Sequence, residues 1–218
     1  MSDIPPSARR INPFLIWGIV SIILCGVLVG YNYLLFRNTQ LVRANQMPPV
    51  KDVLGFALQD QSGNTITKAE FYGQPWIANF IFTRCPGPCG KLSQRMQELQ
   101  ESLPETVKLA SFTVDPEFDQ PPVLETYAEL HEAKPGRWFF LTGDQKTMKQ
   151  LIIKGFQLAV GENDEEIAKT EGLFVHSTNL VLVDRRGMIR KYYDGTNDAA
   201  VAQMKKDLAW LMKNDPAP

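Results

Sequence analysis

IANFIFTRCPGPCG, residues 77–90, joins a continuous apolar run to two closely spaced cysteines. The run over residues 77–82 has the length and residue types of a buried central strand. A polar segment from Lys91 onward carries apolar residues on one helical face, so we expect a turn that holds Cys85 and a helix whose first turn holds Cys89. A helix start offers unpaired backbone N–H groups and a positive dipole end, so both sulfurs should favour the thiolate form.

The two cysteines are spaced differently from the Cys-x-x-Cys motif of thioredoxin-like redox proteins. Three residues separate Cys85 from Cys89, as though one residue had been added to a Cys-Gly-Pro-Cys turn. A purely structural disulfide is one alternative, since residues four apart near a helix start can meet the required geometry. Such a bridge closes a very small loop and constrains the unfolded chain only weakly. A reactive or metal-binding pair is the better interpretation.

An uncharged apolar segment, residues 14–36, precedes the soluble part of the chain. It is long enough to cross a bilayer as a helix and too long for a typical signal-peptide core. We therefore expect four parts: a short tail over residues 1–13, a single uncleaved transmembrane anchor over 14–36, a linker over 37–50 and one domain over 51–214.

Charge and composition narrow the possible partners but leave the orientation open. The net charge is −1 and no Lys/Arg cluster occurs, so nothing indicates nucleic-acid binding. Arg9 and Arg10 precede the apolar segment while Arg37 and Arg43 follow it, so the positive-inside rule does not orient the anchor. Cys25 lies within this segment and is interpreted as a small apolar residue of the helix.

The domain alternates predicted strands and helices and ends in a hairpin and a final helix. This order indicates an α/β fold: a mixed sheet with helices on both faces, in which reactive groups collect at the carboxyl ends of the strands. A hairpin is expected around residues 56–66. The other expected strands are 77–82, 107–114, 138–141, 156–160, 178–183 and 188–193, and the expected helices are 91–103, 123–131, 145–154 and one capped by Asn197 or Asp198.

Two histidines are the candidates for a third metal ligand. His131 closes a polar helix and is most simply a solvated surface residue. His176 stands at the end of an acidic loop, directly before an apolar strand, where a lone histidine is more often structural. In a thioredoxin-like sheet, however, the loop that enters this strand lies beside the cysteine turn. Two thiolates and an imidazole would suit Cu(I), which soft sulfur ligands select.

The chain resembles the Sco/SenC family of membrane-anchored, thioredoxin-like copper proteins. Three segments carry the resemblance: CPGPC at residues 85–89, FTVDPE at 112–117 leading to Asp119, and His176-Ser177 before the strand that ends at Val183-Asp184. The chain departs from the family pattern at Gly90, Val175 and Phe118, where the family often has proline, an acidic residue and arginine. None of these departures removes a cysteine or the histidine.

The resemblance implies a metal site and a role. Cys85, Cys89 and His176 would bind copper as Cu(I), with Cu(II) left open, and the domain would lie on the extracytoplasmic side of the cytoplasmic membrane. The protein would be a metallochaperone that supports assembly of the cytochrome c oxidase copper site, with the apo-oxidase subunit and other copper chaperones or thiol reductants as partners. The alternative is an enzyme, a thiol–disulfide oxidoreductase whose redox-active pair, Cys85 and Cys89, keeps the oxidase cysteines reduced.

Overall fold

The computed structural model describes residues 13–44, 47–85, 87, 89–158 and 177–215. The chain divides into two compact units, residues 1–47 and residues 48–218. In chain order the elements are α1 (Pro13–Ala44), β1 (Lys51–Asp52), β2 (Ala57–Gln59), β3 (Thr65–Thr67), the 3₁₀ helix η1 (Lys68–Phe71), β4 (Trp76–Ile81), α2 (Cys89–Ser102), β5 (Lys108–Thr113), α3 (Pro121–Leu130), β6 (Trp138–Leu141), α4 (Gln145–Gln150), the π-helix η2 (Leu151–Gly155), β7 (Asn179–Val183), β8 (Met188–Asp194) and α6 (Asp198–Asn214).

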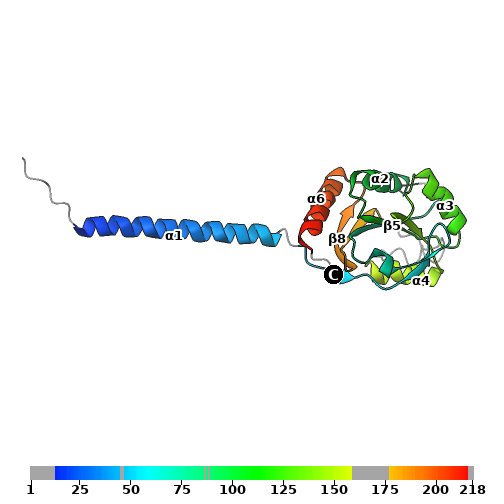
Figure 1. Cartoon of the computed structure of the whole chain (residues 1–218), viewed down its shortest axis with the longest axis horizontal. Coiled ribbons are helices and arrows are strands. Elements are labelled where there is room, and N and C mark those ends of the chain that lie inside the picture. Colours follow the sequence, from blue (N-terminus) through cyan, green and yellow to red (C-terminus); the bar gives the residue numbers. More distant parts are fainter. Residues whose placement is uncertain (1–12, 45–46, 86, 88, 159–176, 216–218) are drawn as a thin grey trace, which may run out of the picture. The chain divides into compact units, whose positions relative to one another are not determined.

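The first unit contains the long helix α1, drawn in blue in Figure 1. Its stretch Ile16–Phe36 has a mean hydropathy of 2.2 and is long and apolar enough to cross a membrane. The helix continues to Ala44, into the segment that we expected to be a linker. The chain therefore has an N-terminal apolar helix, as the sequence predicts.

The second unit is built on a six-stranded mixed sheet with the order β1-β8-β7-β4-β5-β6. β4, β5 and β6 are parallel, whereas β7 is antiparallel to both β4 and β8. All six residues of β4 are buried, as expected for the central apolar run of the sequence. The carboxyl ends of β4, β5 and β6 thus meet at one end of the sheet.

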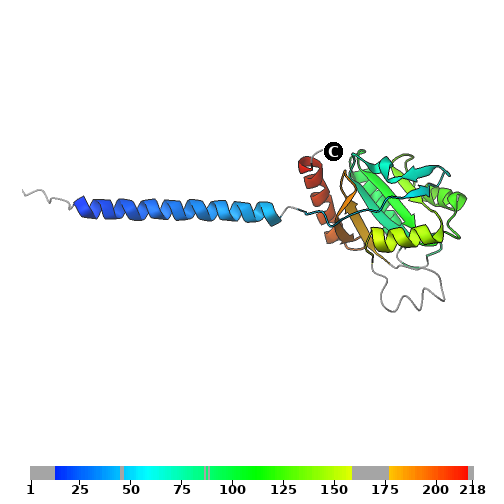
Figure 2. The ribbon, with the colours of Figure 1, turned by 90° about the horizontal axis from the view of Figure 1, so that it is seen from below.

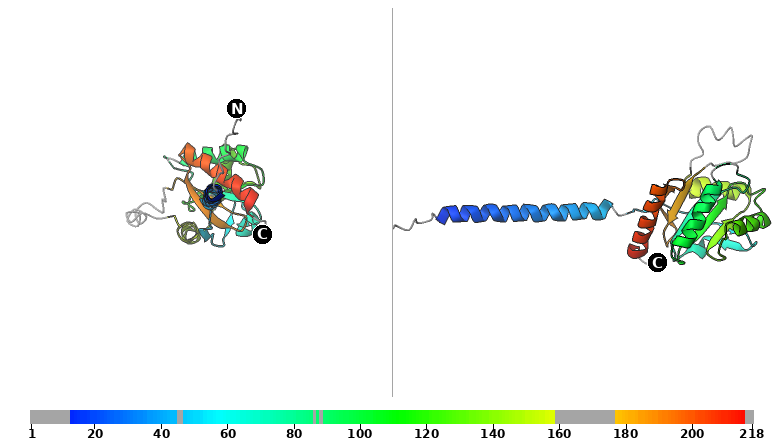
Figure 3. Two further views of the ribbon diagram at one scale, coloured as in Figure 1. Left: turned by 90° about the vertical axis from the view of Figure 1, so that its left-hand side faces the viewer. Right: turned by 90° about the horizontal axis from the view of Figure 1, so that it is seen from above.

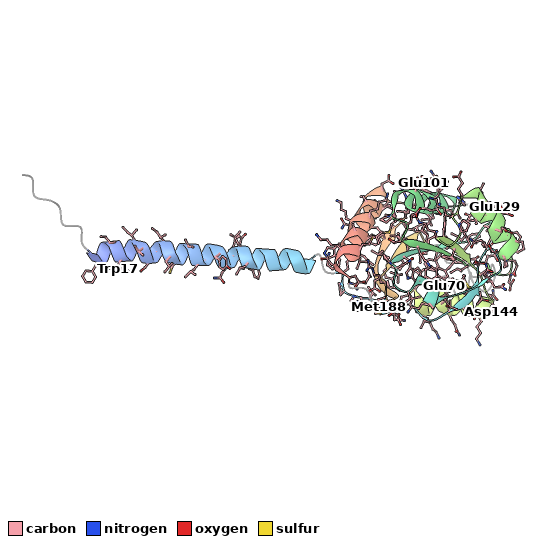
Figure 4. The ribbon with its side chains drawn as sticks, viewed as in Figure 1. Trp17, Glu70, Glu101, Glu129, Asp144 and Met188 are labelled. Carbon is pink, nitrogen blue, oxygen red and sulfur yellow. The ribbon has the colours of Figure 1, made fainter. Side chains whose placement is uncertain are left out.

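Helices cover both faces of this sheet, which confirms the predicted layering. On one face lie α2, α3 and α6, with α2 and α6 side by side over the strands (Figures 1 and 3). Arg95 of α2 joins these two helices through an ion pair with Asp198 of α6. Glu101 on α2 and Glu129 on α3 are exposed and project away from the sheet (Figure 4). The polar faces of these helices therefore meet solvent while their apolar faces meet the sheet.

The opposite face holds the main hydrophobic cluster, and α4 crosses it (Figure 2). Phe156 packs at the centre of this cluster, with ring centroids 5.0 Å from Phe112 and 5.1 Å from Phe80. The hairpin β2–β3 forms a separate two-stranded sheet that contributes Leu58 and Ile66 to the same cluster. Aromatic rings in such contacts add packing energy beyond the area they bury.

The structure corrects the secondary structure expected from the sequence in three places. The described part of the expected strand at residues 156–160 is not a strand, because Phe156 is committed to the aromatic cluster instead of a ladder. The helix expected over residues 145–154 is α-helical only to Gln150 and then continues as a π-helix. The two-residue edge strand β1, paired with β8, was missed.

Candidate metal centre

Cys85 lies in a tight turn just beyond the carboxyl end of β4. The backbone N–H of Cys85 donates to the carbonyl of Phe82 at 3.2 Å, which closes the turn. The cysteine is free and half-buried, and it packs against the main hydrophobic cluster. The backbone N–H of Gly87 donates to its sulfur at 3.4 Å. The sulfur of Cys85 is therefore partly accessible from solvent and held in place by the turn.

Cys89 is the first residue of α2, as the sequence predicts. Its side chain lies outside the described part of the structure. The backbone alone establishes that Cys85 belongs to the turn and Cys89 to the first helical turn. This arrangement brings both residues to the helix start, where backbone N–H groups are unpaired.

A buried carboxylate, Asp119, holds the turn from inside. Its side chain accepts the hydroxyl of Thr83 at 2.5 Å and the backbone N–H of Thr83 at 3.2 Å. The hydroxyl of Thr113, the last residue of β5, donates to the same carboxylate at 2.5 Å. Burial raises the pKa of Asp119 above its ordinary value of 3.8, although the hydrogen bonds from both threonines act in the opposite direction.

Arg84 holds the same turn from outside. Its guanidinium pairs with the carboxylate of Asp115 at 2.7 Å and lies 3.9 Å from the ring centroid of Phe118. Phe118 is one of the positions where the sequence departs from the pattern that it resembles, which often has arginine there. In this chain a guanidinium reaches the same segment from the cysteine turn instead. Stacked on a ring and ion-paired, Arg84 is more restrained than an ordinary exposed arginine.

His176 lies outside the described residues, but the strand that follows it is described. β7 is antiparallel to β4, with Trp76 opposite Val183 and Ala78 opposite Val181. The start of β7 therefore lies toward the carboxyl end of β4, the end at which Cys85 is found. Ser177, the residue after His176, is half-buried, and its hydroxyl accepts the backbone N–H of Asn179 at 3.2 Å. The topology thus brings the chain next to His176 to the end of the sheet that carries the cysteine turn.

His131 is placed elsewhere, and the expectation of a solvated residue is wrong. Its ring is half-buried, 4.7 Å from the ring of Tyr127 and 6.3 Å from that of Trp138. Burial lowers the pKa of His131 below the ordinary 6.5. Trp138 begins β6, which is parallel to β4 through β5, so His131 lies at the end of the sheet opposite Cys85. This position excludes His131 from a site built on Cys85.

The side chains of Cys89 and His176 lie outside the described residues, so the predicted ligand set stays a prediction. Within the described residues, no group of three or more His, Cys, Asp or Glu side chains could hold a metal ion. Of the three predicted ligands, only the side chain of Cys85 is described. Thr83, Thr113 and Asp119 had no predicted role in the site. Thr83 and Thr113 stand at or just after the carboxyl ends of two predicted neighbouring strands, a signal that could have found them, whereas Asp119 lies further along in the following loop and has no such local signal.

The family of the chain follows from comparison with known proteins. The SCO1/SenC family model matches residues 46–213. This chain belongs to the SCO1/SenC family. The SCO1 protein homolog of Bacillus subtilis is 29% identical over 161 residues, which make up 72% of this chain and 81% of the homolog.

Solved structures of SCO1/SenC proteins share the architecture. BsSco, a member of the Sco family of cytochrome c oxidase assembly proteins in which a disulfide switch was identified, is 29% identical; the TM-score is 0.60, over 74% of this chain and 96% of BsSco. ScoI of Bradyrhizobium japonicum, solved with copper bound, is 21% identical with a TM-score of 0.56, over 71% of this chain and 98% of ScoI. The second likeness shows the fold alone. Together they confirm the predicted thioredoxin-like fold.

Proposed function

We propose that this chain is a membrane-anchored copper metallochaperone that supports assembly of the copper site of cytochrome c oxidase. The observation that carries the proposal is the free, half-buried Cys85 at the carboxyl end of β4, the same end at which β7 begins after His176. Membership of the SCO1/SenC family supports the same role. Copper is the cargo of such a protein, held for transfer.

The donor set fits this cargo. Cys85, Cys89 and His176 would supply two thiolates and one imidazole, and soft thiolates select Cu(I) over the harder divalent ions. As a free cysteine, Cys85 can supply the thiolate that a metal ligand requires. Cu(II) binding by the same residues is left open. With three protein donors, the ion would keep an accessible side from which a target could take it.

The proposed cellular arrangement follows from the apolar helix. Residues 14–36 would anchor the protein in the cytoplasmic membrane as a single span, after a short tail over 1–13. Residues 37–50 would link it to the copper-binding domain, residues 51–214, on the extracytoplasmic side. There the domain would meet the apo-oxidase copper-site subunit and exchange copper or electrons with other chaperones or thiol reductants.

A second function, a thiol–disulfide oxidoreductase, is favoured by the hydrogen bond from Gly87 to the sulfur of Cys85. In that reaction the thiolate of Cys85 attacks a disulfide of the target and forms a mixed disulfide. Cys89 then attacks Cys85, so the target gains two electrons and leaves as a dithiol while this chain becomes a disulfide. Copper delivery needs reduced target thiols, so the two functions are compatible.

A Cu(I) titration of the reduced chain tests the proposal. We expect one Cu(I) per chain, and we expect Cys85→Ser and Cys89→Ser each to abolish tight binding because one thiolate is too few soft donors. Cys25→Ser is the matched control, since Cys25 lies in the apolar helix, and it should bind copper like the wild type. Unchanged stoichiometry and affinity in either of the first two variants would refute the proposed site.

A further inference from the structure

The turn that carries Cys85 begins where β4 leaves the sheet. The ladder between β4 and β5 ends at the pair Ile81–Thr113, and one more backbone hydrogen bond, from Val114 to Ile81, follows at 2.8 Å. Beyond it, the backbone N–H of Thr83 no longer faces a strand. Asp119 accepts this N–H in place of a strand carbonyl. An unpaired N–H in this half-buried place would cost folding free energy. By accepting it, the carboxylate of Asp119 allows the chain to leave the sheet after β4.

Asp119 makes this contact from a hydrogen-bonded platform, the segment of residues 114–120 between β5 and α3. Within it, the backbone N–H groups of Phe118 and Asp119 donate to the carbonyl of Asp115 at 3.2 and 2.9 Å. The side chain of Gln120 donates to the carbonyl of Pro116. Asp119 itself is fully buried. The position of its carboxylate is therefore set by the segment and by Thr113, and the turn adapts to it.

Both central residues of the Cys85 turn are held by this platform. Thr83 is bound by Asp119 from inside, and Arg84 is bound by Asp115 and Phe118 from outside. On the other side of the cysteine pair, α2 is fixed by its buried residues Leu92, Met96 and Leu99. The separation between Cys85 and the first turn of α2 thus depends on two anchors, the packing of α2 and the platform.

We propose that Asp119 is a positioning residue for Cys85, which acts through Thr83 to hold the cysteine at the separation from α2 that a shared metal ion or a disulfide requires. This inference rests on the proposed function, because it concerns how Cys85 is presented. A buried carboxylate elsewhere in the sheet provides a comparison. Asp184 is also fully buried and accepts several hydrogen bonds, but it follows β7, at the end of the sheet opposite Cys85.

The test uses the full chain in detergent, with Cu(I) affinity measured by competition with a chromophoric chelator. Asp119→Ala should weaken Cu(I) binding about 10–100-fold, the usual loss when a residue that orients a ligand is removed. Asp119→Asn should restore affinity to within about fivefold of wild type, because the amide oxygen can still accept the N–H of Thr83 while its NH₂ donates to a threonine hydroxyl. Asp184→Asn should lower the unfolding temperature and leave Cu(I) affinity unchanged.

Thr83→Val covers the case in which Asp119→Ala does not fold. This substitution removes only the hydroxyl donor and keeps the hydrogen bond from the backbone N–H to Asp119. It should weaken Cu(I) binding about fivefold, which corresponds to the net free energy of one hydrogen bond. Wild-type affinity in folded Asp119→Ala, or in Thr83→Val where the first variant does not fold, would overturn the inference. Equal losses in Asp119→Ala and Asp119→Asn, or in Asp119→Ala and Asp184→Asn, would do the same.

A second measurement separates this inference from the proposed function. The equilibrium between the Cys85–Cys89 dithiol and disulfide, measured without copper in a dithiol redox buffer, should shift about fivefold toward the dithiol in Asp119→Ala, because a looser turn brings the sulfurs together less often. If wild type binds no Cu(I), the proposed function fails and this shift decides the inference. A shift absent from Asp119→Ala, or equally large in Asp184→Asn, would overturn it.

Discussion

His131 and Asp119 show how burial acts on single titratable residues at opposite ends of one sheet. Burial disfavours the charged form of each, so it lowers the pKa of His131 and raises that of Asp119. The histidine packs beside Tyr127 and Trp138, whereas the carboxylate is bound by Thr83 and Thr113. His131 is thus part of the packing at the carboxyl end of α3, and Asp119 supports the cysteine turn.

The lowered pKa of His131 predicts a pH dependence of stability. The unfolded chain takes up the proton near the ordinary value of 6.5, whereas the folded chain takes it up only at lower pH. Protonation therefore favours the unfolded state: the contribution of His131 is fully present above pH 6.5 and is lost as pH falls through the folded pKa. Urea unfolding at pH 7.5 and 5.5 should show a larger loss in wild type than in His131→Gln. An equal loss in both would contradict the assignment.

Two helices of the domain, α4 and α6, begin at residues whose side chains cap them. Asn197 accepts the backbone N–H groups of Ala199 and Ala200 at the start of α6, and Asp144 accepts that of Thr147 at the start of α4. The sequence offered Asn197 as one of two candidates for the cap of the last helix. These short polar residues fill the same role at both helices by accepting N–H groups that have no helical partner.

Asn197→Ala should lower the free energy of unfolding by about 1 kcal/mol, the usual loss of an N-cap side chain. The matched control is Asn214→Ala at the other end of α6, where an exposed side chain donates to the carbonyl of Trp210. That change should stay within about 0.5 kcal/mol, as for most surface substitutions. Urea unfolding curves give the free energy of unfolding of both variants. An Asn197→Ala variant as stable as wild type would refute the capping role.

Elements with a local signal could be predicted from sequence, and those fixed by distant contacts could not. The strand expected over residues 138–141 matches β6, since four consecutive apolar residues stand between a glycine turn and a cap. Phe156 also stands in an apolar run, yet it packs against rings from β4 and β5 instead of forming a strand. Asp119 reads as an ordinary loop acid until the fold places it beside Thr83. Local periodicity carries no information about such long-range partners.

At the scale of the whole molecule, the chain consists of an apolar helix and a separate folded unit. The hydrophobic core and the six-stranded sheet both lie within residues 48–218. A domain with its own core should fold without the helix. A chain that begins at Pro48 should therefore be recovered without detergent and unfold cooperatively. Its recovery only from detergent, or an uncooperative transition, would contradict the independence of the second unit.

The proposed copper centre is also a property of the whole molecule, because its ligands come from segments far apart in sequence. Cys85 follows β4 and Cys89 begins α2, whereas His176 precedes β7, which pairs with β4 only through the completed sheet. Dithiol chemistry needs the two cysteines and the helix start, but no imidazole. A copper carrier gains from an imidazole, since a third donor completes the copper site. His176 therefore separates the metallochaperone from the pure oxidoreductase.

The most direct measurement compares wild type and His176→Ala in Cu(I) retention and in disulfide exchange. Copper retention should fall by about 10–100-fold or more, taking losses at residues that merely orient ligands as the lower bound. Disulfide exchange by Cys85 and Cys89 should stay within a few-fold of wild type. His131→Gln is the control, because it replaces the other histidine at the opposite end of the sheet while keeping side-chain bulk. Wild-type copper affinity combined with lost disulfide exchange in His176→Ala would contradict the account.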